Sequence, residues 1–121
     1  MGFALVPERG ETIFVNAWNW RPTLELLRAH QILDPESIEM MGYNGGYPVS
    51  AEEAQTIAGV LDRVLAQLGT DDRVLHDLTI TAEPDTFEFY RDDLARNYSA
   101  SAEWLVEFRD FCRAGFGFAV S

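Results

Sequence analysis

An apolar stripe in the middle of the sequence constrains the fold more than any other feature. Its members recur at steps typical of a helix: Ala54, Ile57, Ala58, Leu61, Val64, Leu65 and Leu68. This spacing puts them on one face, which must be buried against other elements. Ser50 and Glu53 form a capping-box pattern before the stripe, and Gly69 suits the position that follows it. We therefore predict an amphipathic helix over residues 50–69.

Two segments near opposite ends of the chain have the composition of β-strands. Residues 11–16 are rich in β-branched and aromatic side chains, and residues 116–120 read Phe-Gly-Phe-Ala-Val. The helices between them need a surface on which to bury their apolar faces. We predict a single α+β domain over residues 1–121, in which both segments join one small sheet packed against about four helices.

Capping residues and apolar spacing predict the other helices. The first has Pro22 at its first position and runs up to Asp34-Pro35. Residues 85–98 fit another helix, although Phe87-Glu88-Phe89 also fits an extended strand. Ser101 caps the last helix, which closes at Gly115. Its predicted inner face consists of Trp104, Leu105, Phe108, Phe111 and Cys112.

The remaining segments are predicted from turn residues and alternation. Residues 42–49 form a loop, because Asn44-Gly45-Gly46 supplies the residues that a tight turn needs. The side chains of residues 71–83 follow a pattern with a period of two residues, which fits a short edge strand or an extended loop. We favour the strand.

Size and cysteine content place few further constraints. The 121 residues are long enough to bury a core without a metal or a disulfide, and the single cysteine, Cys112, excludes an internal disulfide. Its place on a helix inner face favours an inert core thiol. No apolar run approaches the roughly 20 residues that cross a bilayer, so we expect a cytoplasmic protein without membrane contact.

The balance of acidic and basic residues limits the classes of partner that the chain can bind. The chain carries 20 acidic residues against 9 basic ones, all of them arginine, for a net charge of −11. The absence of lysine excludes a Schiff-base nucleophile and a P-loop. The acidic balance argues against nucleic acid and anionic membranes as ligands, and it leaves a basic protein as the favoured partner.

The acidic residues concentrate in the middle third of the chain. Residues 51–85 hold eight acids and two arginines. This segment is either a solvated surface that keeps the domain soluble or a surface matched to a basic partner. The candidate partner-facing residues are Glu52, Glu53, Asp62, Asp71, Asp72 and Asp77.

An aromatic and amide cluster is the candidate ligand site. Trp18, Asn19, Trp20 and Arg21 follow a predicted strand and precede a predicted helix, a position where ligand-contacting loops often lie. Together with Tyr43 and Asn44, they would form a pocket with stacking walls, amide hydrogen bonds and an arginine for an anionic group. Alternatively, the tryptophans fill the core and the asparagines satisfy turn backbone.

Catalytic and cofactor motifs are missing from the sequence. It contains no His-Glu-x-x-His, no Gly-x-Ser-x-Gly, no calcium loop and no glycine-rich phosphate loop. His30 and His76 each have one nearby carboxylate, too few donors for a zinc site. We predict no catalytic residue, no metal and no cofactor.

Several short segments resemble known bacterial proteins. They are Phe14-Val15-Asn16 before Trp18 and Trp20, the Asn44-Gly45-Gly46 turn, and Phe108-x-x-Phe111-Cys112 before Gly115-Phe116. They resemble segments of small bacterial proteins without an assigned activity, which implies a stand-alone domain and no mechanism. In size and acidity the chain is also similar to immunity proteins that neutralise secreted toxins.

Two functional hypotheses follow. The first is a non-enzymatic acidic protein-binding domain, immunity- or inhibitor-like, and it requires a broad surface. The second is a small-molecule-binding or weakly catalytic domain that uses the aromatic and amide corner, and it requires a concave pocket. The sequence predicts no oligomeric state.

Overall fold

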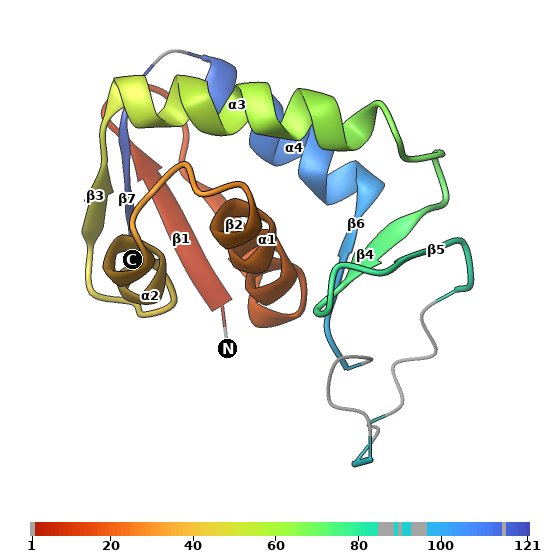
Figure 1. Ribbon diagram of the computed structural model, residues 1–121. Coiled ribbons are helices and arrows are strands. Elements are labelled where there is room, and N and C mark those ends of the chain that lie inside the picture. Colours follow the sequence, from red (N-terminus) through yellow and green to blue (C-terminus); the bar gives the residue numbers. More distant parts are fainter. Residues whose placement is uncertain (1, 85–88, 90, 93–96, 115) are drawn as a thin grey trace.

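Two antiparallel sheets and four helices make up the computed structural model, which describes residues 2–84, 89, 91, 92, 97–114 and 116–121 (Figure 1). The larger sheet has the strand order β2-β1-β7-β3, and the smaller one has the order β5-β4-β6. This arrangement confirms the predicted α+β class. The strands are β1 (Gly2–Pro7), β2 (Ile13–Asn16), β3 (Tyr47–Val49), β4 (Arg73–Leu75), β5 (Ile80–Thr81), β6 (Ser99–Ser101) and β7 (Phe118–Val120). The helices are α1 (Ala17–Ala29), α2 (Pro35–Met41), α3 (Ala51–Leu65) and α4 (Ala102–Arg113).

Strand β1 joins the two strands that the sequence predicts. It pairs antiparallel with β2, where Phe3 lies opposite Val15, and with β7, where Leu5 lies opposite Val120. The predicted terminal strands therefore share one sheet, but each of them pairs with β1 and not with the other. No pattern in residues 2–7 predicted β1. Strand β7 in turn pairs with β3, so it lies between β1 and β3 (Figure 1).

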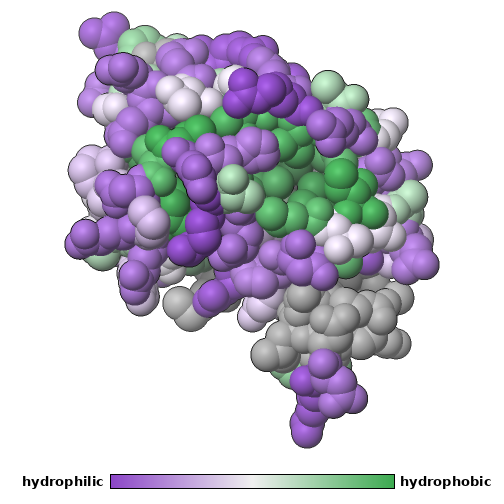
Figure 2. Space-filling view, in the orientation of Figure 1, coloured by the Kyte–Doolittle hydropathy of each residue, from purple (hydrophilic) through white to green (hydrophobic). Residues whose placement is uncertain are grey.

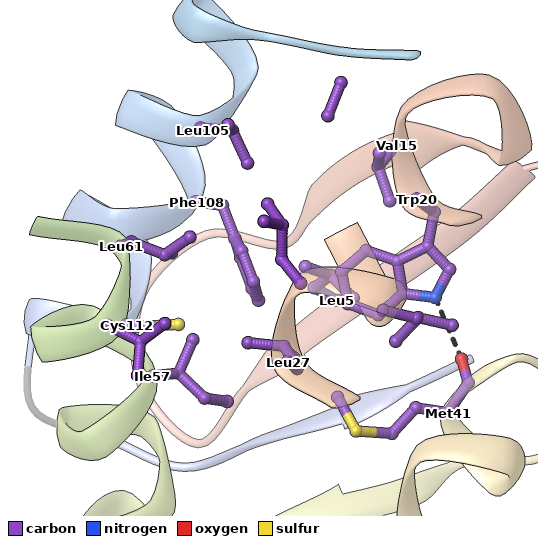
Figure 3. Close-up of a cluster of buried hydrophobic side chains, with 14 of the residues drawn as sticks. Leu5, Val15, Trp20, Leu27, Met41, Ile57, Leu61, Leu105, Phe108 and Cys112 are labelled. Atoms are coloured by element: carbon purple, nitrogen blue, oxygen red, sulfur yellow. Dashed lines mark hydrogen bonds between the residues drawn. The ribbon is translucent and has the colours of Figure 1, made fainter. Parts of the chain in front are cut away.

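Helix α3 begins as predicted. The Ser50 hydroxyl accepts from the Glu53 backbone N–H, and the Glu53 carboxylate accepts from the Ser50 backbone N–H, so the capping box is complete. The helix ends at Leu65 and not next to Gly69, whose N–H donates to the Asp72 carboxylate in the following turn. The predicted stripe faces inward and packs with α4 (Figures 1 and 3).

The core is centred on aromatic side chains. Trp20 is fully buried, and its ring makes an edge contact with Phe108 at a centroid distance of 5.3 Å. Its indole N–H donates to the Met41 carbonyl at 2.9 Å, which satisfies the polar end of the side chain. Figure 3 shows Trp20 and Phe108 among aliphatic side chains from β1, α1 and α3, including Leu5, Leu27 and Leu61.

The predicted start of the first helix is wrong. Helix α1 begins five residues earlier, at Ala17, because the Asn16 side chain accepts from the Asn19 backbone N–H and caps it. Pro22 therefore lies inside the helix, near its N-terminal end, where its missing N–H removes a single helical hydrogen bond. The helix also ends early, at Ala29, because Gln31 has a left-handed φ of 54°.

Two elements after α1 differ from the sequence analysis. Asp34-Pro35, interpreted as a stop signal, starts α2: the Asp34 carboxylate accepts from the Ser37 backbone N–H, and Pro35 occupies the first turn. The predicted loop over residues 42–49 is wrong for its last three residues. Tyr47–Val49 is strand β3, because its backbone pairs with β7, a contact with a segment distant in sequence.

The smaller sheet accounts for part of the second half of the chain. Strand character over residues 71–83 is confirmed for β4 and β5, which are joined by a turn in which Leu78 has a φ of 71°. The predicted helix over residues 85–98 falls largely outside the described residues. In α4, Ser101 is the N-cap as predicted, and the predicted inner face is buried except at Phe111, which is half-buried.

We predict opposite effects of alanine at two glycines. A Cβ on Gly117 would lie 2.5 Å from the Val49 carbonyl oxygen and 3.1 Å from the Ala51 nitrogen, both backbone atoms at the β3–α3 corner. Gly117→Ala should therefore lower the free energy of unfolding by about 1–3 kcal/mol. Gly59→Ala should raise it by about 0.5–1 kcal/mol, because Gly59 is helical and nothing lies within 4 Å of its Cβ position.

Urea unfolding followed by circular dichroism measures both changes against the wild type. A Gly117→Ala midpoint at or above that of the wild type would contradict the close approach of β7 to this corner.

Candidate functional site

The structure divides the predicted aromatic and amide corner. Trp20 is in the core, whereas Trp18 is half-buried and its ring meets the Tyr98 ring edge-on at 5.3 Å. Arg21 is exposed, and its guanidinium lies over the same Tyr98 ring at 5.5 Å. The four residues 18–21 lie on the first turns of α1 and not in a loop, so successive side chains point in different directions.

The asparagines of the corner hold backbone together. Asn19 accepts from the Ser101 backbone N–H at 3.0 Å through its side-chain oxygen, which fastens α1 to β6. The Asn44 side chain donates to the carbonyls of Gly2 at 2.8 Å and Ser121 at 3.1 Å, which ties the turn before β3 to the larger sheet. Both side chains have structural partners, as in the alternative interpretation of the sequence.

A buried hydrogen-bond relay links α1 with α4. The Trp104 indole N–H donates to the Thr23 hydroxyl at 2.9 Å, and that hydroxyl donates to the Asn19 carbonyl at 2.8 Å. Thr23 is fully buried, so these bonds satisfy polar groups that water does not reach. The relay therefore joins α4 to α1 through hydrogen bonds as well as through apolar contacts.

Arg21 and Tyr43 do come together, in a groove between α1 and α2. We name it the α1–α2 groove; its volume is about 310 Å³. Its lining residues are Arg21, Leu24, Glu25, Arg28, Ile38, Glu39, Gly42, Tyr43 and His76. His76, to which the sequence analysis gave no role, closes the groove from the end of β4. Only the fold brings His76 beside Arg21, because no local pattern connects residues 55 positions apart.

The predicted acidic residues are distributed along α3 and the turns that follow it. Glu53 belongs to the capping box, and Asp72 accepts from the Gly69 N–H at 2.7 Å. Asp62 forms ion pairs with Arg109 and Arg113 of α4. Glu52 is exposed in the first turn of α3, and Asp71 is exposed beyond its end.

Asp77 stabilises the β4–β5 turn. Its carboxylate accepts from the Thr79 backbone N–H at 3.0 Å. This hydrogen bond, together with one from the Thr79 side chain, holds the pKa of Asp77 below its usual value. Four of the six predicted acidic residues thus have intramolecular partners: Glu53, Asp62, Asp72 and Asp77.

Another concave region surrounds Phe14, which belongs to the strand predicted over residues 11–16 but to neither predicted site. Phe14 is 76% exposed in β2, at the edge of the larger sheet. A hollow of about 580 Å³ lies on one side of it, over the sheet, and a groove of about 300 Å³ lies on the other. We name the latter the β2 groove; it is lined by Phe14, Val15, Asn16, Asn19, Ser101, Glu103, Trp104 and Glu107.

Nucleophiles and metal ligands are not grouped in the described part of the chain. No three His, Cys, Asp or Glu side chains among these residues are placed to hold a metal ion. Cys112 is buried, as predicted, and its burial raises the pKa of the thiol. His30 lies at the end of α1 with its Nδ1 3.1 Å from the Leu26 carbonyl oxygen.

Comparisons of the chain with family models, with curated proteins and with solved structures find no match. Among the described helices, none is long and apolar enough to cross a membrane. In the view of Figure 2 the surface is mainly hydrophilic, with a hydrophobic band beneath α3.

We predict that the relay between α1 and α4 contributes measurably to stability. Thr23→Val keeps the side-chain shape but leaves the Trp104 indole N–H without its acceptor, which should lower the free energy of unfolding by about 1–3 kcal/mol. The matched control is Thr56→Val, because the Thr56 hydroxyl is exposed on α3 and donates only to the Glu52 carbonyl. It should change stability by less than about 0.5 kcal/mol.

Chemical unfolding of the two variants gives the comparison directly. Equal free energies of unfolding for Thr23→Val and Thr56→Val would show that the buried relay contributes no more to stability than an exposed hydrogen bond does.

Proposed function

We propose that this chain is a non-enzymatic, cytoplasmic protein-binding domain of the inhibitor or immunity type, and that a basic partner docks beside Phe14. The observation that carries the proposal is the position of this side chain. A phenylalanine that is 76% exposed on an edge strand, with a hollow on each side, is a suitable anchor for a partner.

The open face of the larger sheet extends the apolar surface beyond Phe14. Ala4 lies opposite Phe14 in the neighbouring strand, and Val6 lies opposite Ala119. Because successive side chains of a strand alternate between faces, these four residues lie on the face opposite the buried Phe3 and Leu5. Val6 is itself 42% exposed, so the apolar surface spans more than one strand.

The charges beside Phe14 favour a basic partner. Glu103 and Glu107, one turn apart on α4, line the β2 groove, and no basic residue lines it. A lysine or arginine of a partner that covers Phe14 would meet both carboxylates. The net charge of −11, which includes the six acidic residues predicted from the sequence, would attract such a partner from a distance.

The edge position of β2 favours an extended partner segment. In the described part of the larger sheet, β2 pairs with β1 alone, so its other side faces the β2 groove. An added strand would bond to the backbone of β2 while its side chains alternate between the groove and the open sheet face. We therefore propose a partner that presents an extended segment containing basic and apolar residues.

The alternative function, small-molecule binding at the aromatic and amide corner, has weaker support. Trp20, Asn19 and Asn44 have structural partners, and they do not line the α1–α2 groove formed by the described residues. Arg21 and Tyr43 are the two members of that corner that share a groove.

The proposal predicts how capture of a partner depends on single residues and on salt. The wild-type chain should capture a basic protein from a lysate of its own organism at about 0.05 M NaCl and lose much of it at about 0.5 M, because salt screens exposed charges. Phe14→Ala should abolish capture, and Glu103→Gln with Glu107→Gln should weaken it at the lower salt concentration.

Phe89→Ala is the matched control, because Phe89 is 64% exposed but lies outside the sheet. Mass spectrometry of the bound fractions, with circular dichroism to confirm folding, measures the outcome. Failure to capture any protein at either salt concentration would overturn the proposal, as would a partner retained by Phe14→Ala.

A further inference from the structure

The α1–α2 groove is lined by the guanidinium of Arg21, which forms no ion pair with the described residues, and by the ring of His76. On α1, Arg21, Glu25 and Arg28 are spaced four and three residues apart, so they lie on one face of the helix. This face borders the groove that α2 lines from the other side. Glu39 of α2 supplies the facing carboxylate, and His76 lies at the end of β4. The groove is thus a polar site built from three separate elements.

The charges of the groove are only partly paired. Glu25 forms an ion pair with Arg28 at 3.5 Å. Arg21 makes no ion pair with any carboxylate in the described part of the chain, and its guanidinium lies over the face of the Tyr98 ring. Its planar fork of N–H donors, which matches the two oxygens of a carboxylate, is therefore available to a ligand.

Tyr98 places Arg21 and His76 beside each other. Its ring contacts the Arg21 guanidinium at 5.5 Å and the His76 ring at 5.7 Å between centroids. The Nδ1 atom of His76 is buried and has no hydrogen-bond partner among the residues that the structure describes, an arrangement that costs free energy in a folded chain. His76 also lines the α1–α2 groove, so a ligand bound there would lie beside its ring.

We propose that the α1–α2 groove binds a small organic monocarboxylate. The Arg21 guanidinium holds the carboxylate through two parallel hydrogen bonds, and the Tyr43 side chain flanks the body of the ligand. A volume of about 310 Å³ suits a small molecule. This groove and the docking surface around Phe14 consist of different residues, so the two proposals are independent of each other.

The two glutamate carboxylates that line the groove affect which anion binds there. Glu25 and Glu39 line the same groove as Arg21. Both carboxylates repel any anion in the groove, and they repel a doubly charged phosphate more strongly than a monocarboxylate. The Arg21 guanidinium, which has no ion pair among the described residues, neutralises only one negative charge. We therefore expect a monocarboxylate to bind more tightly than inorganic phosphate does.

A nuclear magnetic resonance titration with sodium butanoate tests the proposal at constant ionic strength. The Arg21 side-chain N–H and the His76 ring resonances should shift with a dissociation constant on the order of 1 mM, as one bidentate contact and a small apolar body allow. Arg21→Gln should weaken binding at least about tenfold, and Arg21→Lys should weaken it too, because an ammonium lacks the fork.

Arg63→Gln is the matched control, because it removes the same charge from an exposed position on α3 and should leave the dissociation constant unchanged. Inorganic phosphate is titrated in parallel. The proposal is overturned if butanoate causes no shifts up to about 50 mM. It also fails if Arg21→Gln binds as the wild type does, or if phosphate binds more tightly than butanoate.

Discussion

The burial of the Trp20 indole is the interaction on which the rest of the structure depends. Its N–H bonds to the last residue of α2, its ring meets Phe108 of α4 edge-on, and it lies 6.1 Å from the Phe3 ring of β1. A side chain this large is stable in a core only when its polar end is satisfied. One residue thus sets the relative positions of α1, α2, α4 and the larger sheet.

The orientation of α1 that buries Trp20 also determines what the helix exposes. With Trp20 and Thr23 directed into the core, the groove-lining positions of the same helix, Arg21, Glu25 and Arg28, face α2 and the solvent. The polar groove and the aromatic core are therefore two sides of one helix. The aromatic and amide cluster of the sequence is divided between them, since adjacent residues of a helix point about 100° apart.

Local signals account for the part of the fold that the sequence predicts. The Ser50 capping box, the apolar stripe of α3 and the Ser101 cap need only neighbouring residues, and each is confirmed. Strands β1 and β3 exist because of pairing with distant segments, which no local pattern encodes. The same distinction applies to the candidate sites. Residue type was enough to select Arg21 and Tyr43 as candidate ligand-binding residues. The proximity of His76 and the exposure of Phe14 follow only from the tertiary structure.

The order of the larger sheet has a consequence for how the chain reaches its fold. Strand β7 comes last in the sequence but lies between β1 and β3, which precede it by about 70 residues or more. Until β7 inserts, β1 and β3 have no partner at their facing edges, and the core lacks Phe118 and Val120. A foreign strand that paired with these two edges would therefore compete with the chain's own three-residue β7.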